Sequence, residues 1–274
     1  MSASSIEPAA LGLPGRQPLE LWGAWPPAPR IAVVGSRAMS GRHAQCTRAW
    51  VAAAAARGFS LVSGGARGID ITAHRAALEL GMPQAVVLPS APEWIYPPEH
   101  RTEFETIARA RDSGVLFGAP PGTPAARGLF ASRNRLVVAA SVAVVVVQAR
   151  RRSGSMGTGR LALRRGLPVA VCLGSEGAEA LVAEGAFSVG HASDLEDARL
   201  DPWLSAVARG ETPVAPSDVW PQHLGWLSDA LRDAPPLGRP LESMGPALPA
   251  MCALTEAIDL GLVVECAPGR YRRA

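Results

Sequence analysis

The chain has 274 residues, enough for one large α/β domain with a smaller appendage, so a disulfide-stapled miniprotein is excluded. Hydrophobic residues make up 48% and charged residues 19% of the sequence, and we therefore expect most of the chain to fold. The formal net charge is +3, and all 27 basic residues are arginine.

No segment has the character of a membrane anchor or an export signal. The longest apolar run, residues 136–147, is shorter than the roughly 18 residues that a membrane span requires. Met1 to Pro14 lack a basic segment followed by an apolar one. The four cysteines show no metal-ligand spacing: Cys46, Cys172, Cys252 and Cys266. We expect a cytoplasmic protein that makes no membrane contact and binds no metal.

The charges are unevenly distributed along the chain. Residues 30–165 contain 19 arginines and 7 acidic residues, whereas the remainder contains 8 arginines and 17 acidic residues. No acidic residue occurs between Asp112 and Glu176, although nine arginines do. A GC-rich genome explains the absence of lysine but not the absence of acids. The pattern favours a polyanion site, because guanidinium groups bind phosphate through paired hydrogen bonds.

The predicted elements begin after a leader. Residues 1–29 are rich in Ala, Pro and Gly and predict a tail with one short segment at Leu19–Trp25. From Arg30, the apolar run Ile31–Val34 predicts a strand, and Ser40 can cap the helix that follows. Further strands are expected at 59–62, 85–88, near Val115, at 142–147 and at 169–173, with helices between them. This alternation predicts an α/β domain over residues 30–200, with a Rossmann-like, doubly wound and mainly parallel sheet.

The C-terminal part predicts a second, smaller module. Residues 201–217 contain Pro202, Pro213 and Pro216 and predict a linker. Within residues 218–274, a helical spacing of apolar residues precedes two short β-like runs separated by a Pro-Gly turn. A helix followed by a small hairpin predicts a winged-helix-like module.

Three glycine-containing loops follow predicted strands and have the composition of phosphate-binding turns. Such loops lie at the carboxyl edge of a parallel sheet, where helix N-termini present unpaired N–H groups. The candidate residues are Gly35, Ser36 and Arg37; Gly64, Gly65 and Arg67; and Ser153, Gly154, Ser155 and Thr158. Each loop alone also has a purely steric explanation. The spacing fits neither a dinucleotide fingerprint nor a P-loop, so we expect no nucleotide cofactor.

A fourth segment adds an aromatic residue to these loops. Phe130, Arg133, Asn134 and Arg135 lie where a long loop enters a predicted helix. A nucleobase stacked on an aromatic ring gains about 1–3 kcal/mol, while arginines neutralise phosphate. The alternative for Phe130 is a core residue that anchors the loop. Taken together, the four segments indicate a polyanion site that has groups suited to both phosphates and bases.

The sequence contains no evident catalytic constellation, and we expect no enzyme. Asp70 and His74 share a helix face and could bind metal or exchange a proton. Helix capping by Asp70 and burial of His74 are the favoured interpretations.

In these segments the sequence resembles the DprA (Smf) family of DNA-processing proteins. The matching segments are Ile31–Arg37, Ser63–Asp70 with Ala73-His74, Tyr96-Pro97, Phe130–Arg135 and Ser153–Thr158. The resemblance implies a Rossmann-like domain that binds single-stranded DNA through the candidate residues, forms a homodimer and helps to load the RecA recombinase during natural transformation. Many family members also have a C-terminal winged helix. The sequence departs from the family at Phe117-Gly118, where the family has Ser-Glu, and at Gly65, where Leu is usual.

The main alternative function is a nucleotide phosphoribohydrolase of the "lonely guy" type, which has a similar fold. That signature needs a carboxylate three residues after its Gly-Thr pair. Alignment on Gly157-Thr158 places Leu161 there, and leucine cannot stabilise a ribosyl cation. A protein-interaction adaptor that uses the acidic C-terminal part is a third class, and it is compatible with DNA binding.

Overall fold

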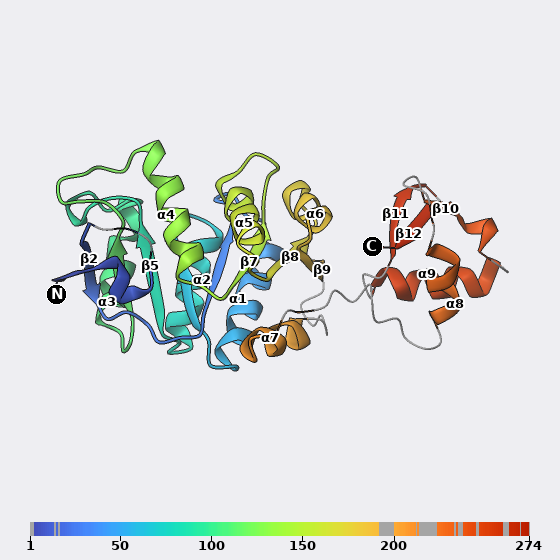
Figure 1. Ribbon diagram of the computed structural model, residues 1–274, viewed down its shortest axis with the longest axis horizontal. Coiled ribbons are helices and arrows are strands. Elements are labelled where there is room, and N and C mark those ends of the chain that lie inside the picture. The colour runs from blue at the N-terminus through green and yellow to red at the C-terminus, as the bar shows by residue number, and fades with distance from the viewer. Residues whose placement is uncertain are drawn as a thin grey trace. The chain divides into compact units, whose positions relative to one another are not determined.

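The computed structural model describes residues 3–13, 15, 17–191, 200–211, 213, 224–232, 234, 238–244, 247–259, 263–268 and 270–273. The chain forms two compact units, Met1–Phe187 with His191–Pro213, and Ser188–Gly190 with Val214–Ala274. Figure 1 shows the elements of both units. Within the described residues, no helix combines the length and apolarity needed to span a bilayer.

The largest sheet has the order β1-β2-β6-β5-β4-β3-β7-β8-β9 among the described strands, of which β1 to β8 belong to the larger unit. Their bounds are β1 (Ala3–Ile6), β2 (Leu19–Gly23), β3 (Arg30–Gly35), β4 (Ser60–Ser63), β5 (Gln84–Leu88), β6 (Gly114–Phe117), β7 (Ala143–Gln148), β8 (Val169–Leu173) and β9 (Phe187–His191). The strands from β3 to β8 pair in parallel. Their apolar runs are buried on both faces, as is usual for parallel sheets.

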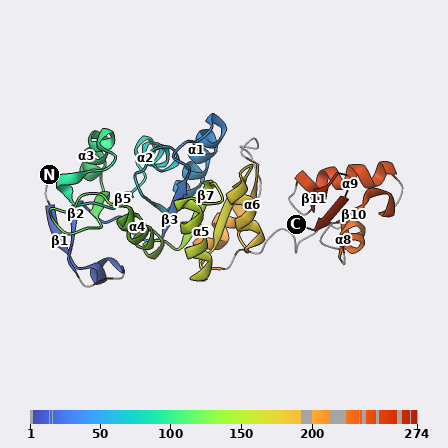
Figure 2. The same ribbon diagram turned by 90° about the horizontal axis from the view of Figure 1, so that it is seen from above.

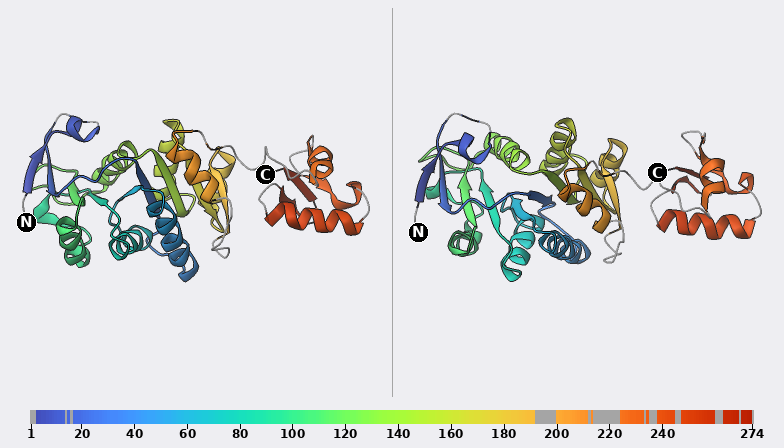
Figure 3. Two further views of the ribbon diagram at one scale, coloured as in Figure 1. Left: turned by 90° about the horizontal axis from the view of Figure 1, so that it is seen from below. Right: turned by 60° about the horizontal axis from the view of Figure 1, so that its bottom comes forward.

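Helices cover both faces of this sheet. Figures 2 and 3 show α1 (Gly41–Ala55), α2 (Ile69–Glu79) and α3 (Arg101–Arg109) on one face, and α4 (Arg127–Ala139), α5 (Gly154–Arg164) and α6 (Glu176–Ala183) on the other. Short 3-10 helices lie at Pro8–Leu11, Pro92–Trp94 and Pro98–His100. The predicted cap of α1 is confirmed, because the Ser40 side chain accepts a hydrogen bond from the His43 N–H. The predicted Rossmann-like, doubly wound fold is also confirmed.

The prediction of an N-terminal tail is wrong. Strand β2 pairs antiparallel with β6 and also with β1. Leu21 is buried, and the Trp22 ring lies 4.7 Å from that of Phe117, centroid to centroid. The short apolar segment therefore covers an edge strand whose backbone groups would otherwise be unpaired. The surrounding prolines and glycines concealed this strand, since they resemble a linker in composition.

The predicted linker over 201–217 is wrong in its first half. Helix α7 (Leu200–Ala208) begins there, and Trp203 is buried with its ring centroid 6.4 Å from that of Phe187. Asp201 forms an ion pair with Arg57, which lies just after the end of α1, with Oδ1 and Nη2 3.0 Å apart. Pro202 lies in the first turn of α7, where its missing N–H has no intrahelical partner to lose. Residues 212 and 214–217 lie outside the described residues.

The smaller unit has a core and a sheet of its own. It contains α8 (Gly225–Leu231), β10 (Arg239–Pro240), a 3-10 helix (Leu241–Ser243), α9 (Ala247–Asp259), β11 (Val263–Ala267) and β12 (Arg270–Arg273). The described strands follow the order β10-β12-β11, and both pairs are antiparallel. Leu227, Leu254 and Val263 pack in its core. The expected C-terminal hairpin is confirmed, whereas the winged-helix assignment stays a prediction.

Candidate functional site

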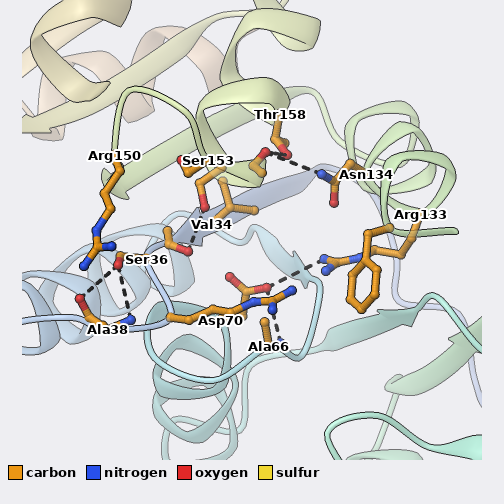
Figure 4. A pocket seen from close by; sticks show the side chains of 15 residues that line it. Val34, Ser36, Ala38, Ala66, Asp70, Arg133, Asn134, Arg150, Ser153 and Thr158 are labelled. Carbon is orange, nitrogen blue, oxygen red and sulfur yellow. Dashed lines mark hydrogen bonds and ion pairs between the residues drawn. The ribbon is translucent and has the colours of Figure 1, made fainter. Parts of the chain in front are cut away.

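A cavity of 280 Å³ lies at the carboxyl ends of β3, β4 and β7 (Figure 4). The chain winds outward from β3 to β6 on one side of this point and from β7 to β9 on the other. Such a change of direction separates the loops that follow adjacent strands, and ligands of open α/β sheets bind there. The cavity is therefore at the position where this fold most often has its site.

The loop after β3 and the loop after β4 are in direct backbone contact next to the cavity. The Ser36 carbonyl accepts a hydrogen bond from the Ile69 N–H at 3.1 Å. A Cβ at Gly35 would lie 2.5 Å from the Ile69 side chain, and one at Gly68 would lie 2.2 Å from the Ser36 carbonyl oxygen. Gly68 also has φ +76°, which favours glycine. Close backbone approach explains both glycines and fixes the loop that presents Arg37.

An aromatic and a guanidinium group form one wall. The Arg37 side chain is exposed, and its Cζ lies 5.2 Å from the centre of the Phe130 ring, within cation–π range. The Tyr96 ring meets Phe130 edge-on, with centroids 5.8 Å apart. Phe130 is half-buried and lines the cavity. It therefore anchors this wall while part of its ring remains accessible.

A buried ion pair forms the base of the cavity. Arg133 Nη1 lies 3.7 Å from Asp70 Oδ2, and the two side chains are only 7% and 5% exposed. A Cβ on Gly64 would come 1.3 Å from Arg133 Nη1, so the absence of a side chain at Gly64 makes room for the guanidinium. Arg133 is thus a buried cation in the wall of the cavity, and its predicted contact with DNA stays a prediction.

Asp70 does not cap α2, contrary to the expectation, because Gly68 is the N-cap residue. The Asp70 carboxylate instead accepts the Ala66 N–H at 3.4 Å. Burial raises the pKa of Asp70, and the positive charge of Arg133 and the N–H groups of Ala66, Gly35 and Gly64 oppose this shift. Burial also lowers the pKa of Arg133. One carboxylate therefore connects the loops after β3 and β4 to helix α4.

The third loop is fixed by its own hydroxyl groups. Ser153 caps α5 by accepting the Met156 N–H at 3.2 Å, and Ser155 Oγ donates to the Gly35 carbonyl at 2.7 Å. Thr158 Oγ1 and Asn134 Nδ2 both donate to the Gly154 carbonyl, at 3.0 and 3.4 Å. The N-terminus of α5 is consequently held at the cavity, and its unpaired N–H groups favour an anion there.

Four predicted residues, Gly64, Gly65, Arg67 and Arg135, do not line this cavity. Arg67 pairs with Glu99 and lines only a small adjoining hollow, together with Gly64 and Tyr96. Gly65 has φ +66°, and a Cβ there would lie 2.8 Å from the Phe104 ring. Arg135 is exposed on α4 and lines none of the described cavities.

Sequence reasoning missed Arg150 as a site residue. Its exposed side chain comes from the loop after β7 and lines the cavity. The run Arg150–Arg152 directly before the third loop was the signal that could have identified it.

The predicted burial of His74 is confirmed. Its side chain is inaccessible, and Nδ1 lies 2.7 Å from the terminal amide of Gln84. Burial lowers the pKa of His74 to about 4. Across the described residues, no three His, Cys, Asp or Glu side chains are grouped closely enough to hold a metal ion.

Comparisons with known sequences agree with the earlier resemblance. A family model described as DNA recombination-mediator protein A matches residues 17–199. The putative DNA processing protein DprA of Mycobacterium tuberculosis is 40% identical over 194 residues, which cover 66% of this chain and 49% of that protein. The DNA processing protein DprA of Streptococcus pneumoniae is 33% identical over 173 residues, covering 61% and 60%. The chain spans about half the length of the curated relatives it matches.

Two solved structures share the fold. DNA processing protein A of Streptococcus pneumoniae superposes with a TM-score of 0.61 at 29% identity, covering 71% of this chain and 72% of that one. DNA processing protein A of Helicobacter pylori gives a TM-score of 0.64 at 26% identity, covering 77% and 98%. The latter structure is described as giving insight into the single-stranded DNA binding mode of that protein.

Proposed function

Because the chain belongs to the DNA recombination-mediator protein A family, we propose that its larger unit binds single-stranded DNA in the cavity at the ends of β3, β4 and β7. The observation that supports this most directly is the exposed Arg37 guanidinium lying against Phe130 on the cavity wall. Such a pair offers one group for a phosphate and one for a base. The single-stranded DNA binding mode described for the Helicobacter pylori relative is in line with it.

The shape and charge of the cavity favour an unpaired strand. Phe130 is reached from within the cavity, so a base must leave its stack to meet the ring. Arg37 and Arg150 are exposed at the cavity and have no ion pair with any carboxylate in the described part of the chain. Their charges are therefore available to phosphates, with the N-terminus of α5 beside them.

Arg37→Ala tests the proposal. The wild-type chain should bind fluorescein-labelled dT20 with an affinity that falls steeply with salt, since each neutralised phosphate contributes a slope of about 0.7. Arg37→Ala should lower affinity about tenfold and reduce the slope by about 0.7. Arg165→Ala, an exposed residue with no ion pair among the described residues, is the matched control.

Fluorescence anisotropy at several salt concentrations measures both quantities. A wild-type affinity that does not change with salt, or equal losses in the two variants, would refute the proposal. A duplex of the same sequence should bind more weakly than dT20.

We propose binding rather than hydrolysis. Leu161, at the position where the phosphoribohydrolase signature needs a carboxylate, packs against the apolar core. Asp70, the carboxylate lining the cavity, is held by Arg133. Release of adenine from AMP above the rate of a buffer control would overturn this assignment.

The finer activities implied by the family are proposals as well. We propose that the chain forms a homodimer and assists the loading of a RecA-type recombinase on single strands, as in natural transformation. Sedimentation velocity tests the dimer. Recombinase filament formation on DNA coated with a single-strand-binding protein tests the loading. A monomer at micromolar concentration, or unchanged filament kinetics, would contradict the respective proposal.

A further inference from the structure

A second, larger cavity adjoins the first. It has a volume of 580 Å³, compared with 280 Å³ for the first, and lies beyond the ends of β7 and β8. The two cavities share Ser36, Ala38 and Arg150 in their walls. They are therefore neighbouring parts of one edge of the sheet, with Arg150 at the boundary between them.

The second cavity has a concentration of unpaired positive charge. Arg150, Arg151 and Arg152 all line it and are all exposed. Among the described residues, none of the three forms an ion pair with a carboxylate. Glu176 is the acidic residue in its lining, and it too is without an ion pair there. Three guanidiniums against one carboxylate leave an excess of positive charge available to an anion.

The far wall of this cavity is rigidly placed. Ser175 Oγ accepts the Ala149 N–H at 3.1 Å, and the Gly177 N–H donates to the Ala149 carbonyl at 3.0 Å. A Cβ at Gly177 would lie 2.7 Å from that carbonyl oxygen, so helix α6 begins in direct contact with the end of β7. The loop that carries Arg150–Arg152 therefore lies across the cavity from a wall that is held in place by hydrogen bonds.

We propose that the DNA strand held in the first cavity continues past Arg150 into the second, where Arg151 and Arg152 bind the next phosphates of the same strand. This inference rests on the proposed function. The shared wall favours one continuous ligand over two separate ones. The volume of the second cavity is within the range of pockets that enclose whole small ligands, so it has room for a further nucleotide.

The test is the double variant Arg151→Ala/Arg152→Ala, with dT20 as the probe. Loss of two phosphate contacts should reduce the slope of log affinity against log salt by about 1.4, and should weaken binding at least tenfold at moderate salt. The variant Arg151→Lys/Arg152→Lys keeps both charges and should retain most of the slope. Arg151 and Arg152 are exposed, so the melting temperatures of both double variants should match that of the wild type.

Arg164→Ala/Arg165→Ala is the matched control, because it removes the same charge from exposed residues at the other end of α5. If the Arg151/Arg152 variant binds dT20 like this control while Arg37→Ala is still weakened, the continuation is wrong and the proposed function stands. If the wild-type chain itself does not bind dT20, the proposed function and the continuation of the strand into the second cavity are both wrong. A cavity that instead takes an acidic protein segment would leave the DNA slope unchanged, which also overturns the inference.

Discussion

Removal of Arg133 should destabilise the larger unit more than it directly weakens DNA contacts. The side chain is 7% exposed and lies 3.7 Å from Asp70, which is equally buried. Arg133→Ala leaves that carboxylate without its charge partner, and breaking a buried pair from one side costs about 3–5 kcal/mol. For a unit of this size, such a loss lowers the melting temperature by about 6–20 °C.

Gly64→Ala should destabilise the larger unit by a similar amount and for the same reason, the loss of the ion pair between Arg133 and Asp70. The new Cβ would lie 1.3 Å from Arg133 Nη1, and the nearest atoms around it all belong to Arg133. The guanidinium must therefore leave its site, and the ion pair breaks. In an Arg133→Ala background the Cβ has room, so Gly64→Ala should then cost little. The two substitutions should be strongly non-additive, with a coupling of at least about 2 kcal/mol.

Differential scanning calorimetry of the four proteins in this cycle measures the coupling, and Arg135→Ala is the control because its side chain is exposed on the same helix. Additive shifts would refute the reasoning. So would an Arg133→Ala protein that melts within about 2 °C of the wild type but loses as much DNA affinity as Arg37→Ala, because Arg133 would then be a phosphate ligand.

Two further predictions concern Phe130 and His74. Phe130→Ala should weaken binding of dT20 by about 1–3 kcal/mol and binding of an abasic strand much less, whereas equal losses would make Phe130 a structural residue only. His74 binds its proton more readily in the unfolded chain, because burial lowers its folded pKa from 6.5 to about 4. The free energy of unfolding should therefore fall as pH decreases from 6.5 towards 4, by about 1.4 kcal/mol per pH unit, and urea titrations of His74→Gln at pH 7 and pH 5 should lack this loss.

Much of the fold could be predicted because the parallel strands are continuous apolar runs separated by helices. Ile31–Val34 and residues 142–147 are of this kind, and both form central strands. Strand β2 could not be predicted in the same way, because it pairs through non-local contacts with β6 and has prolines and glycines around it. Composition likewise concealed α7, whose burial of Trp203 depends on tertiary contact.

The sequence predicted which loops form the candidate site. It did not predict which of their arginines would be paired with a carboxylate. The carboxyl edge of a parallel sheet brings the loops after β3, β4 and β7 together whatever their side chains, so strand order alone placed Arg37 and Ser153 at one cavity. Whether a guanidinium has a carboxylate partner depends on which acidic residue the fold places beside it. Asp70 lies beside Arg133, and Glu99 beside Arg67, across long stretches of sequence.

The buried ion pair between Asp70 and Arg133 has a different role from the exposed arginines of the cavity. Asp70 connects the loops after β3 and β4 with helix α4 through backbone N–H groups and Arg133, so the positions of Arg37 and Phe130 depend on a pair that itself has little contact with solvent. A charge used in this way is costly to remove. Under the proposed function, the guanidiniums of the first cavity that have no ion pair with a carboxylate among the described residues, Arg37 and Arg150, are the ones we expect to meet phosphate. For that reason we expect the strand to run from Phe130 towards the loop that carries Arg150–Arg152 rather than towards Arg67, whose guanidinium pairs with Glu99.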